Sequence, residues 1–330
     1  MSDRSELMPI VGKAHAFWQA RILLTAAELD VFEHVLEKEK TAAEVAAEYP
    51  ADERGMEALL NSVTSLGLLV KNDAKFRVRP GFEKFLAKES PETVVPLVMH
   101  MAHLWDRWSK LTDIVLKGAK EVMGERTERD DEMLAAFIGA MHAIGSQMAS
   151  RVISTLDLSG KKKLLDVGGG SGVYTIAALK AAPQLRATLF DNPKVVKIAE
   201  AKLKEEGLAD RVELVAGDFY KNQLPGAHDV ALLSAIIHQN SREQNVALYR
   251  KIYEALVPGG TLIIRDFVMS EDHTQPPDGT FFAINMLVNT PGGGTYSFKE
   301  ISEDLAQAGF KDSKLLHHGD MDSVVSAKKG

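Results

Sequence analysis

The sequence predicts an α/β fold in which a doubly wound parallel sheet fills the carboxyl-terminal half of the chain. From residue 163 onward, short apolar runs alternate with amphipathic helical patterns, which is typical of parallel strands joined by helices. A turn with three alternating glycines follows the first run, and acidic residues follow several later runs. Strands are expected at 163–167, 186–190, 212–216, 229–234 and 261–265, and two more near 314–318 and 323–327 close the sheet. Helices are expected at about 172–182, 194–206, 242–256 and 298–308, and a long loop at 275–279.

The amino-terminal part has the pattern of a winged helix. Residues 14–36 carry apolar side chains at helical spacing, which predicts one or two helices. Thr41 followed by Glu44 predicts a capped helix start, a second helix is expected from residue 56 to 66, and 75–79 alternate as a strand should. The second helix offers few basic side chains for reading DNA, so the pattern favours dimerisation over DNA binding.

The segment between these two parts reads as a helical connector. It is rich in aromatic, methionine and histidine side chains, which either form a core between helices or roof the substrate pocket of the following domain. The predicted domains are therefore a winged-helix domain at 1–90, a connector at 91–158 and a ligand-binding domain at 159–330.

Composition excludes several function classes. The net charge of -7 argues against a general nucleic-acid or acidic-membrane partner. The chain has no cysteine, which excludes disulfides, thiolate catalysis and thiolate metal sites. No apolar run is long enough to span a bilayer and no signal-peptide pattern is present, so a cytoplasmic location is expected. The histidines at 100, 103, 317 and 318 lack a recognised ligand spacing, and no metal site is expected.

The glycine turn narrows the ligand. Gly168, Gly170 and Gly172 let the backbone turn sharply and approach a ligand closely. A nicotinamide or flavin site would need glycine where this chain has Val173, and the Gly-Lys-Ser/Thr of a phosphate loop is missing. These features favour a ligand that carries adenosine but no pyrophosphate.

Asp191 ends the second predicted strand and suits the vicinal hydroxyls of a ribose, because a carboxylate accepts two hydrogen bonds. It could equally cap the helix that begins near Pro193.

With these motifs in place, the chain resembles the class I S-adenosylmethionine-dependent methyltransferases. More narrowly, it resembles the plant-type and bacterial small-molecule O-methyltransferases, which include the caffeate and acetylserotonin enzymes. The motifs that carry the resemblance lie at 26–32, 65–69, 191–193, 217–219 and 291–293. The resemblance implies a Rossmann-like, seven-stranded methyltransferase sheet, a winged-helix domain that forms a homodimer, S-adenosyl-L-methionine as cofactor and a small-molecule acceptor.

The resemblance also implies roles for individual residues. Those expected to bind the cofactor are Asp166, Gly168, Gly169, Gly170, Asp191, Asn192, Gly217, Asp218, Phe219 and Ser234. Those expected to line the substrate pocket are Met141, His142, Met286, His103, Trp105 and Phe282.

His238 occupies the place of the family's catalytic base, soon after the fourth strand. Methyl transfer to a phenol needs help from a base near neutral pH, because phenols titrate near pKa ~10, and imidazole suits that task. Asp266 ends the next strand and could hold the other imidazole nitrogen. The alternative is a histidine at a helix start that only satisfies backbone groups.

Two departures from the family pattern leave other activities open. Gln239 and Asn240 replace the usual Asp-Trp after the base, and Thr295 replaces a second carboxylate beyond the Pro-Gly-Gly turn. The leading hypothesis is metal-free O-methylation of a small aromatic molecule. The alternatives are C-methylation of a tetrapyrrole or other planar acceptor, a relative that no longer methylates, and a winged-helix regulator that senses a metabolite.

Overall fold

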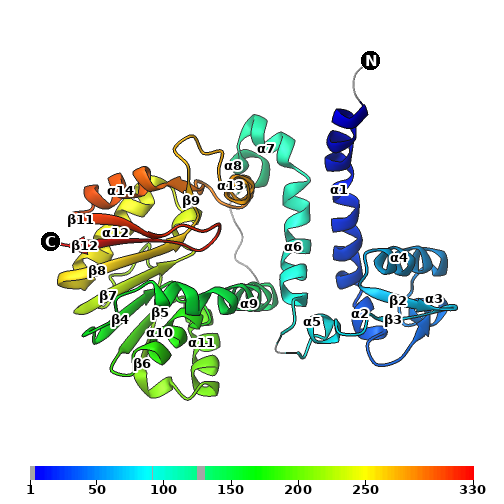
Figure 1. Cartoon of the computed structure of the whole chain (residues 1–330), viewed down its shortest axis with the longest axis horizontal. Coiled ribbons are helices and arrows are strands. Elements are labelled where there is room, and N and C mark those ends of the chain that lie inside the picture. The colour runs from blue at the N-terminus through cyan, green and yellow to red at the C-terminus, as the bar shows by residue number, and fades with distance from the viewer. Residues whose placement is uncertain (1–3, 91, 125–130) are drawn as a thin grey trace. The chain divides into compact units, whose positions relative to one another are not determined.

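The computed structural model describes residues 4–90, 92–124 and 131–330 (Figure 1). The chain divides into two compact units, Met1–Trp105 and Asp106–Gly330. The predicted connector does not form a unit by itself in this division, because helix α6 (Val95–Trp108) begins in the first unit and the helices after it belong to the second. The domain boundaries at 90 and 158 stay a prediction.

The first unit contains one long helix, several shorter ones and a three-stranded antiparallel sheet. Its elements before α6 are α1 (Arg4–Glu28), α2 (Val31–His34), β1 (Lys40–Thr41), α3 (Ala42–Ala47), α4 (Glu53–Ser65), β2 (Leu69–Asn72), β3 (Lys75–Val78) and α5 (Glu83–Leu86). The strand order is β1-β3-β2. The predicted helix start at Thr41 is confirmed as a capping box with Glu44. Helix α4 buries Met56, Leu60 and Val63, which share one face because they are spaced by four and three residues.

The second unit is built on a seven-stranded sheet. Its strands are β4 (Lys163–Val167), β5 (Arg186–Asp191), β6 (Val212–Ala216), β7 (His228–Ser234), β8 (Leu256–Asp266), β11 (Phe310–His317) and β12 (Ser323–Lys329). They lie in the order β11-β12-β8-β7-β4-β5-β6. All seven predicted strands are therefore confirmed. The first five run parallel, and β12 runs antiparallel to both of its neighbours, because the short link between β11 and β12 cannot form a crossover.

Helices cover both faces of this sheet (Figure 1). The helices that follow α6 are α7 (Leu111–Lys117), α8 (Ala119–Met123), α9 (Asp131–Ser154), α10 (Val173–Ala181), α11 (Pro193–Glu205), α12 (Arg242–Ala255), α13 (Pro277–Asn289) and α14 (Phe298–Gln307). Of these, α7 and α8 pack with α13. Successive strand residues enter opposite cores: Ile263 of β8 packs with residues of α9 and α10, and Ile264 packs with residues of α12 and α14.

The expectation of a long loop at 275–279 is wrong in its second half. Helix α13 begins at Pro277, so Asp278 and Gly279 lie in its first turn. Proline is favoured in the first turn of a helix, where its missing N–H has no partner to lose. The Pro-Pro-Asp-Gly run therefore starts a helix here.

Candidate active site

The carboxyl ends of the parallel strands bring the predicted site residues to one edge of the sheet. Strands β6, β5, β4, β7 and β8 are consecutive neighbours, and each is followed by residues that the sequence singled out. In such sheets ligands bind outside the carboxyl ends of the strands, at the point where the strand order reverses. That point lies between β4 and β7.

The glycine turn after β4 holds the carboxylate of Asp191. The Gly170 N–H donates to Asp191 Oδ2 at 2.8 Å, and the Asn192 N–H donates to Oδ1 at 2.6 Å. Burial raises the pKa of Asp191, and these two N–H donors oppose that rise. Asn192 is the residue that caps α11, since its side chain accepts from the Lys194 N–H. Asp191 is therefore free of the capping role that the sequence had left open.

Gly170 shows why glycine is needed in this turn. Its φ is +57°, a left-handed conformation that side chains disfavour, and a methyl group added there would meet nothing within 4 Å. The backbone of the turn is therefore open on that side, where a ligand can approach. Gly168 is close to a different neighbour, since a methyl group there would lie 3.6 Å from Phe219. The turn after β4 and the residues after β6 are thus brought together.

Asp166, the acidic residue of β4, is buried close to this turn. It is 1% exposed and accepts a hydrogen bond of 2.6 Å from the Thr175 hydroxyl of α10. Burial raises the pKa of Asp166 to about 6, and the nearby carboxylate of Asp191 adds to the rise.

Asp218 and Ser234 lie at the ends of the flanking strands. Asp218 forms a turn after β6, in which its Oδ1 accepts from the Tyr220 N–H at 2.9 Å and its own N–H donates to Asn222. Ser234 is the last residue of β7, and its buried hydroxyl has no hydrogen-bond partner among the described residues other than the Tyr174 side chain.

His238 and Asp266 form a close pair. The Nδ1 atom of His238 lies 2.8 Å and 3.0 Å from the two carboxylate oxygens of Asp266. Asp266 is 3% exposed and also accepts from the Phe267 N–H at 2.8 Å. A carboxylate only accepts hydrogen bonds, so Nδ1 carries a hydrogen and Nε2 of the neutral ring keeps its lone pair for another proton. The predicted proximity of the two side chains is confirmed.

The turn at Pro291–Gly294 packs directly on the backbone of His238. The Gly294 N–H donates to the His238 carbonyl at 2.9 Å. A methyl group on Gly293 would lie 2.4 Å from that same carbonyl oxygen, so only glycine fits. The Pro-Gly-Gly motif therefore fixes the short helix η2 (Ile237–Gln239), which carries the histidine.

Two predicted pocket residues share one face of α13. The Phe282 ring stands nearly perpendicular to the His238 ring, with 4.8 Å between their centres. Met286 follows four residues later and is buried. Phe267 packs against Phe282 from behind, with ring centres 4.9 Å apart.

The remaining predicted pocket residues come from α6 and α9. His142 of α9 bonds through Nδ1 to the Ser171 hydroxyl at 2.8 Å, and burial lowers its pKa. Met141, its neighbour in the chain, is half-buried. His103 and Trp105 belong to the first unit, where the Arg21 guanidinium stacks 5.4 Å above the Trp105 ring. A place for His103 and Trp105 in the substrate pocket stays a prediction.

The two departures from the family pattern have local roles in packing. Asn240 is fully buried and bonds through its side chain to the Tyr220 hydroxyl and to Asn245, and its carbonyl accepts from the Tyr296 hydroxyl. Thr295 is buried, and its hydroxyl donates to the Gly279 carbonyl at 3.3 Å.

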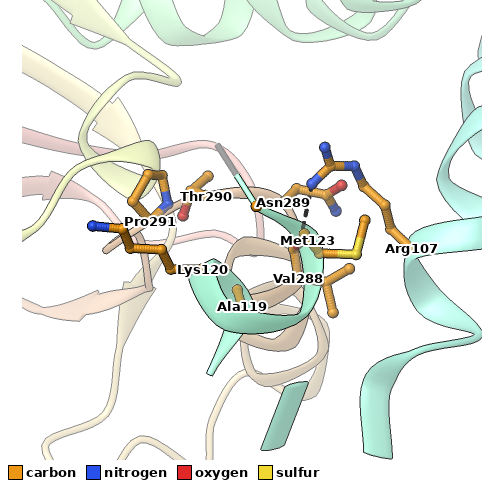
Figure 2. A pocket seen from close by; sticks show the side chains of 9 residues that line it. Arg107, Ala119, Lys120, Met123, Val288, Asn289, Thr290 and Pro291 are labelled. Atoms are coloured by element: carbon orange, nitrogen blue, oxygen red, sulfur yellow. Dashed lines mark hydrogen bonds between the residues drawn. The ribbon is translucent and has the colours of Figure 1, made fainter. Parts of the chain in front are cut away.

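A cavity of about 260 Å³ opens beside α13 (Figure 2). Its lining is mostly apolar, with the cationic side chains of Arg107 and Lys120 on it. It does not include His238, but the Thr290 hydroxyl on its wall accepts from the Gly293 N–H at 2.8 Å. The turn that fixes His238 thus also borders the cavity. It is lined by Arg107, Ala119, Lys120, Met123, Gly124, Val288, Asn289, Thr290 and Pro291.

Sequence reasoning missed Arg265. This residue precedes Asp266 on β8, is 4% exposed and forms no ion pair with a carboxylate of the described residues. Its signal was present, since a lone charged residue stands near the end of an otherwise apolar run, Leu262–Ile264.

No helix in the described part of the chain is long and apolar enough to cross a membrane. No group of three or more His, Cys, Asp or Glu side chains at the described positions could hold a metal ion.

Comparison with known proteins identifies two family matches. A family model described as the O-methyltransferase domain matches residues 108–311, and one described as the O-methyltransferase dimerisation domain matches residues 12–83. A 3-hydroxy-5-methyl-1-naphthoate 3-O-methyltransferase from Streptomyces sahachiroi is 29% identical over 308 residues, covering 92% of this chain and 89% of that protein. An L-tyrosine C(3)-methyltransferase from Streptomyces lavendulae is 27% identical, covering 93% and 87%. The structure of human N-acetylserotonin methyltransferase in complex with SAM superposes with a TM-score of 0.85 at 26% identity, covering 100% of this chain and 99% of that one.

Proposed function

The chain belongs to the O-methyltransferase family, and on that premise we propose that it transfers a methyl group to a hydroxyl of a small aromatic molecule, with His238 as general base. Its cofactor is S-adenosylmethionine. The observation that carries the proposal is the His238–Asp266 pair at the carboxyl edge of the sheet, beside the glycine turn.

The residues present suit this cofactor. S-adenosylmethionine supplies a methyl group activated by a positively charged sulfur. The open backbone at Gly170 allows close approach, and the Asp191 carboxylate beside it can accept from ribose hydroxyls. Phe219 offers an aromatic surface for adenine next to the same turn. Asp166, Gly169, Asn192, Gly217, Asp218 and Ser234 complete the proposed cofactor site.

His238 would take the proton of the acceptor hydroxyl as its oxygen bonds to the methyl carbon. Asp266 holds Nδ1–H, which leaves Nε2 as the basic atom and fixes the plane of the ring. Asp266 is buried and hydrogen-bonded by the backbone, so its own orientation is also fixed. The pair is therefore arranged before any acceptor arrives.

The acceptor would lie against α13. Phe282 borders the imidazole, and Met286 one turn later adds a polarisable apolar surface. We place Met141 and His142 of α9 in the same pocket, together with His103 and Trp105. An aromatic acceptor suits such a lining.

We further propose that the amino-terminal domain, residues 1–90, is a winged helix that forms a homodimer. The family match at 12–83 and the helix, helix, hairpin order of α3, α4, β2 and β3 support this. The connector at 91–158 and the methyltransferase domain at 159–330 follow it. The cytoplasmic location stays a prediction.

C-methylation is the second candidate. It is favoured by the relative that methylates a carbon of L-tyrosine, and by Thr295, which stands where the family pattern has a carboxylate. A tetrapyrrole or other planar acceptor would belong to this class.

One experiment separates these candidates. The protein is incubated with methyl-labelled S-adenosylmethionine and three probes, N-acetylserotonin, 3-hydroxy-2-naphthoate and L-tyrosine, and the methylated atom is located by mass spectrometry and NMR. We expect O-methyl products, and a rate 10²–10⁴-fold lower for His238→Ala. Binding of S-adenosylhomocysteine to that variant should be unchanged, and a His318→Ala control should keep the full rate. An equal rate in His238→Ala would overturn the proposed base, and carbon methylation would favour the second candidate.

A further inference from the structure

Three buried polar groups that have no hydrogen-bond partner among the described residues outside their own cluster lie together near the carboxyl ends of β7 and β8. They are the hydroxyls of Tyr174 and Ser234 and the Nε atom of Arg265. Arg265 and Ser234 are paired across the two strands, so their side chains lie on the same face. The Arg265 guanidinium carbon is 5.7 Å from the centre of the Tyr174 ring. Burial raises the pKa of Tyr174, whereas the charge of Arg265 and a hydrogen bond with the Ser234 hydroxyl act to lower it, so the three side chains lie in one cluster.

The Arg265 guanidinium is a buried cation with no anion of its own. Among the described residues its hydrogen bond runs from Nη2 to the Met148 sulfur at 3.3 Å, and no carboxylate of these residues pairs with it. An unpaired buried charge is costly, and buried charges are normally paired. The buried Arg265 guanidinium is therefore suited to bind a negatively charged group of a ligand.

Tyr174 also lies near the amino end of helix α10. Tyr174 is the second residue of α10, whose first N–H groups and dipole favour an anion. The cluster thus combines a guanidinium and two hydroxyls, and one of its side chains comes from the first turn of α10.

The order of strands indicates which anion reaches the cluster. Asp191 ends β5 and the glycine turn follows β4, so a cofactor with its ribose at Asp191 would extend from β5 over β4. Continuing in that direction leads to β7 and then β8, with neighbouring strands about 4.8 Å apart. The methionine end of S-adenosylmethionine carries an α-carboxylate.

We propose that Arg265, with the hydroxyls of Tyr174 and Ser234, binds the α-carboxylate of S-adenosylmethionine. The inference rests on S-adenosylmethionine being the cofactor, and it does not depend on His238 being the base. Arg265 is then the cation that fixes the methionine end, and the cluster is left unpaired within the chain because the cofactor completes it.

Calorimetry with two ligands tests the inference. S-adenosylhomocysteine carries the α-carboxylate, and 5'-methylthioadenosine lacks the whole amino-acid end. Arg265→Met should weaken binding of S-adenosylhomocysteine by about 10- to 100-fold and leave binding of methylthioadenosine within about 2-fold, because hydrogen bonds to charged groups are the strong ones. Arg265→Lys should fall between wild type and Arg265→Met. Arg250→Met removes an equal charge from the exposed side of α12 and should change neither affinity.

The other outcomes are equally definite. Equal weakening of both ligands, or of neither, in Arg265→Met overturns the inference. Failure of the wild-type protein to bind either ligand overturns the cofactor site itself, which is a separate result. If Arg265→Met does not fold, the double variant Ser234→Ala with Tyr174→Phe replaces it. That variant should lose about 3- to 10-fold in affinity for S-adenosylhomocysteine alone, and no selective loss would count against the inference.

Discussion

Asp266 and Arg265 are consecutive residues of β8, and they differ in how completely the chain satisfies them. Asp266 faces His238 and accepts hydrogen bonds from the imidazole and from a backbone N–H. Arg265 faces the opposite side, beside α9 and α10, and its Nε has no partner. Both are almost fully buried, at 3% and 4% exposure. The end of β8 therefore carries a charged side chain with a partner, Asp266, on one face and a charged side chain without an anionic partner among the described residues, Arg265, on the other.

The difference separates two tasks that a transferase must perform. A base has to be held in one orientation before the reaction, so its partner belongs to the protein. A charged side chain contributes most to ligand affinity when no group of the protein already pairs with it. The ligand then offsets the free-energy cost of burying that charge unpaired. We infer that the partnered face serves proton transfer and that the unpartnered face serves cofactor binding.

Asp266→Asn breaks the partnered face and should have the largest effect. An amide can accept from Nδ1–H or donate to Nδ1, so the ring loses its fixed tautomer and its carboxylate partner. We expect kcat to fall by about 10²- to 10⁴-fold, with affinity for S-adenosylhomocysteine within about 2-fold of wild type. Single-turnover rates and calorimetry measure the two quantities. A drop in affinity without a drop in kcat would assign Asp266 to binding and remove the contrast with Arg265.

The sequence predicted the partnered face better than the unpartnered one. His238 and Asp266 follow separate strands, and the rule that ligands meet strand ends was enough to bring them together. All seven strands of the sheet could be predicted because short apolar runs of parallel strands are distinct from the helices between them. Asp191 could not be resolved from sequence, because a helix cap and a ribose ligand use the same residue type at the same place.

Arg265 could not be predicted as a binding residue, because its importance depends on the lack of a carboxylate beside it. Strand alternation gives the face on which a residue lies, but the lack of a carboxylate nearby is a property of the packed core. The Pro-Pro-Asp-Gly run misled for a related reason, since the same residues serve turns and helix starts. Only the following helical face, with Phe282 and Met286, decides between them.

Asp166→Asn tests the charge on the unpartnered face through the pH dependence of stability. Asp166 lies on the α10 side of β4, and its folded pKa of about 6 is above its unfolded value of 3.8. The folded state therefore keeps a proton that the unfolded state releases first. This stabilising contribution is complete below pH 3.8 and is lost as the pH rises through about 6.

In Asp166→Asn this pH-dependent contribution to the free energy of unfolding should be absent. Relative to Asp166→Asn, the wild-type protein should lose about 2 kcal/mol of unfolding free energy between pH 4 and pH 7.5. Urea unfolding at a series of pH values measures the difference. Asp210→Asn, on the exposed η1 (Ala209–Arg211), should keep the wild-type slope. A wild-type slope in Asp166→Asn would show that the proton resides on another group.

Asn240→Ala tests how much the partnered side contributes to stability. The side chain of Asn240 joins the Tyr220 hydroxyl to Asn245, and its loss leaves buried polar atoms unsatisfied. We expect the free energy of unfolding to fall by about 2 kcal/mol. Chemical denaturation measures it, with Gln307→Ala on the exposed end of α14 as a control expected within about 0.5 kcal/mol of wild type. A small effect for Asn240→Ala would mean that water replaces the amide.

Tyr174→Phe makes the smallest change and sharpens the contrast most directly. On the partnered side, removing a hydrogen-bonding group leaves its neighbours unsatisfied, so stability falls. Outside its cluster with Ser234 and Arg265, the Tyr174 hydroxyl has no partner among the described residues, and its removal also ends the cost of burying it. The free energy of unfolding of the ligand-free variant should therefore equal that of wild type or exceed it by up to about 1 kcal/mol.

The stabilisation that saturating S-adenosylhomocysteine adds should shrink in Tyr174→Phe, because a ligand stabilises the folded protein according to its affinity. Thermal melts with and without the ligand measure both quantities. A loss of stability in the ligand-free variant would show that the chain itself uses this hydroxyl, and the two faces of β8 would then be alike.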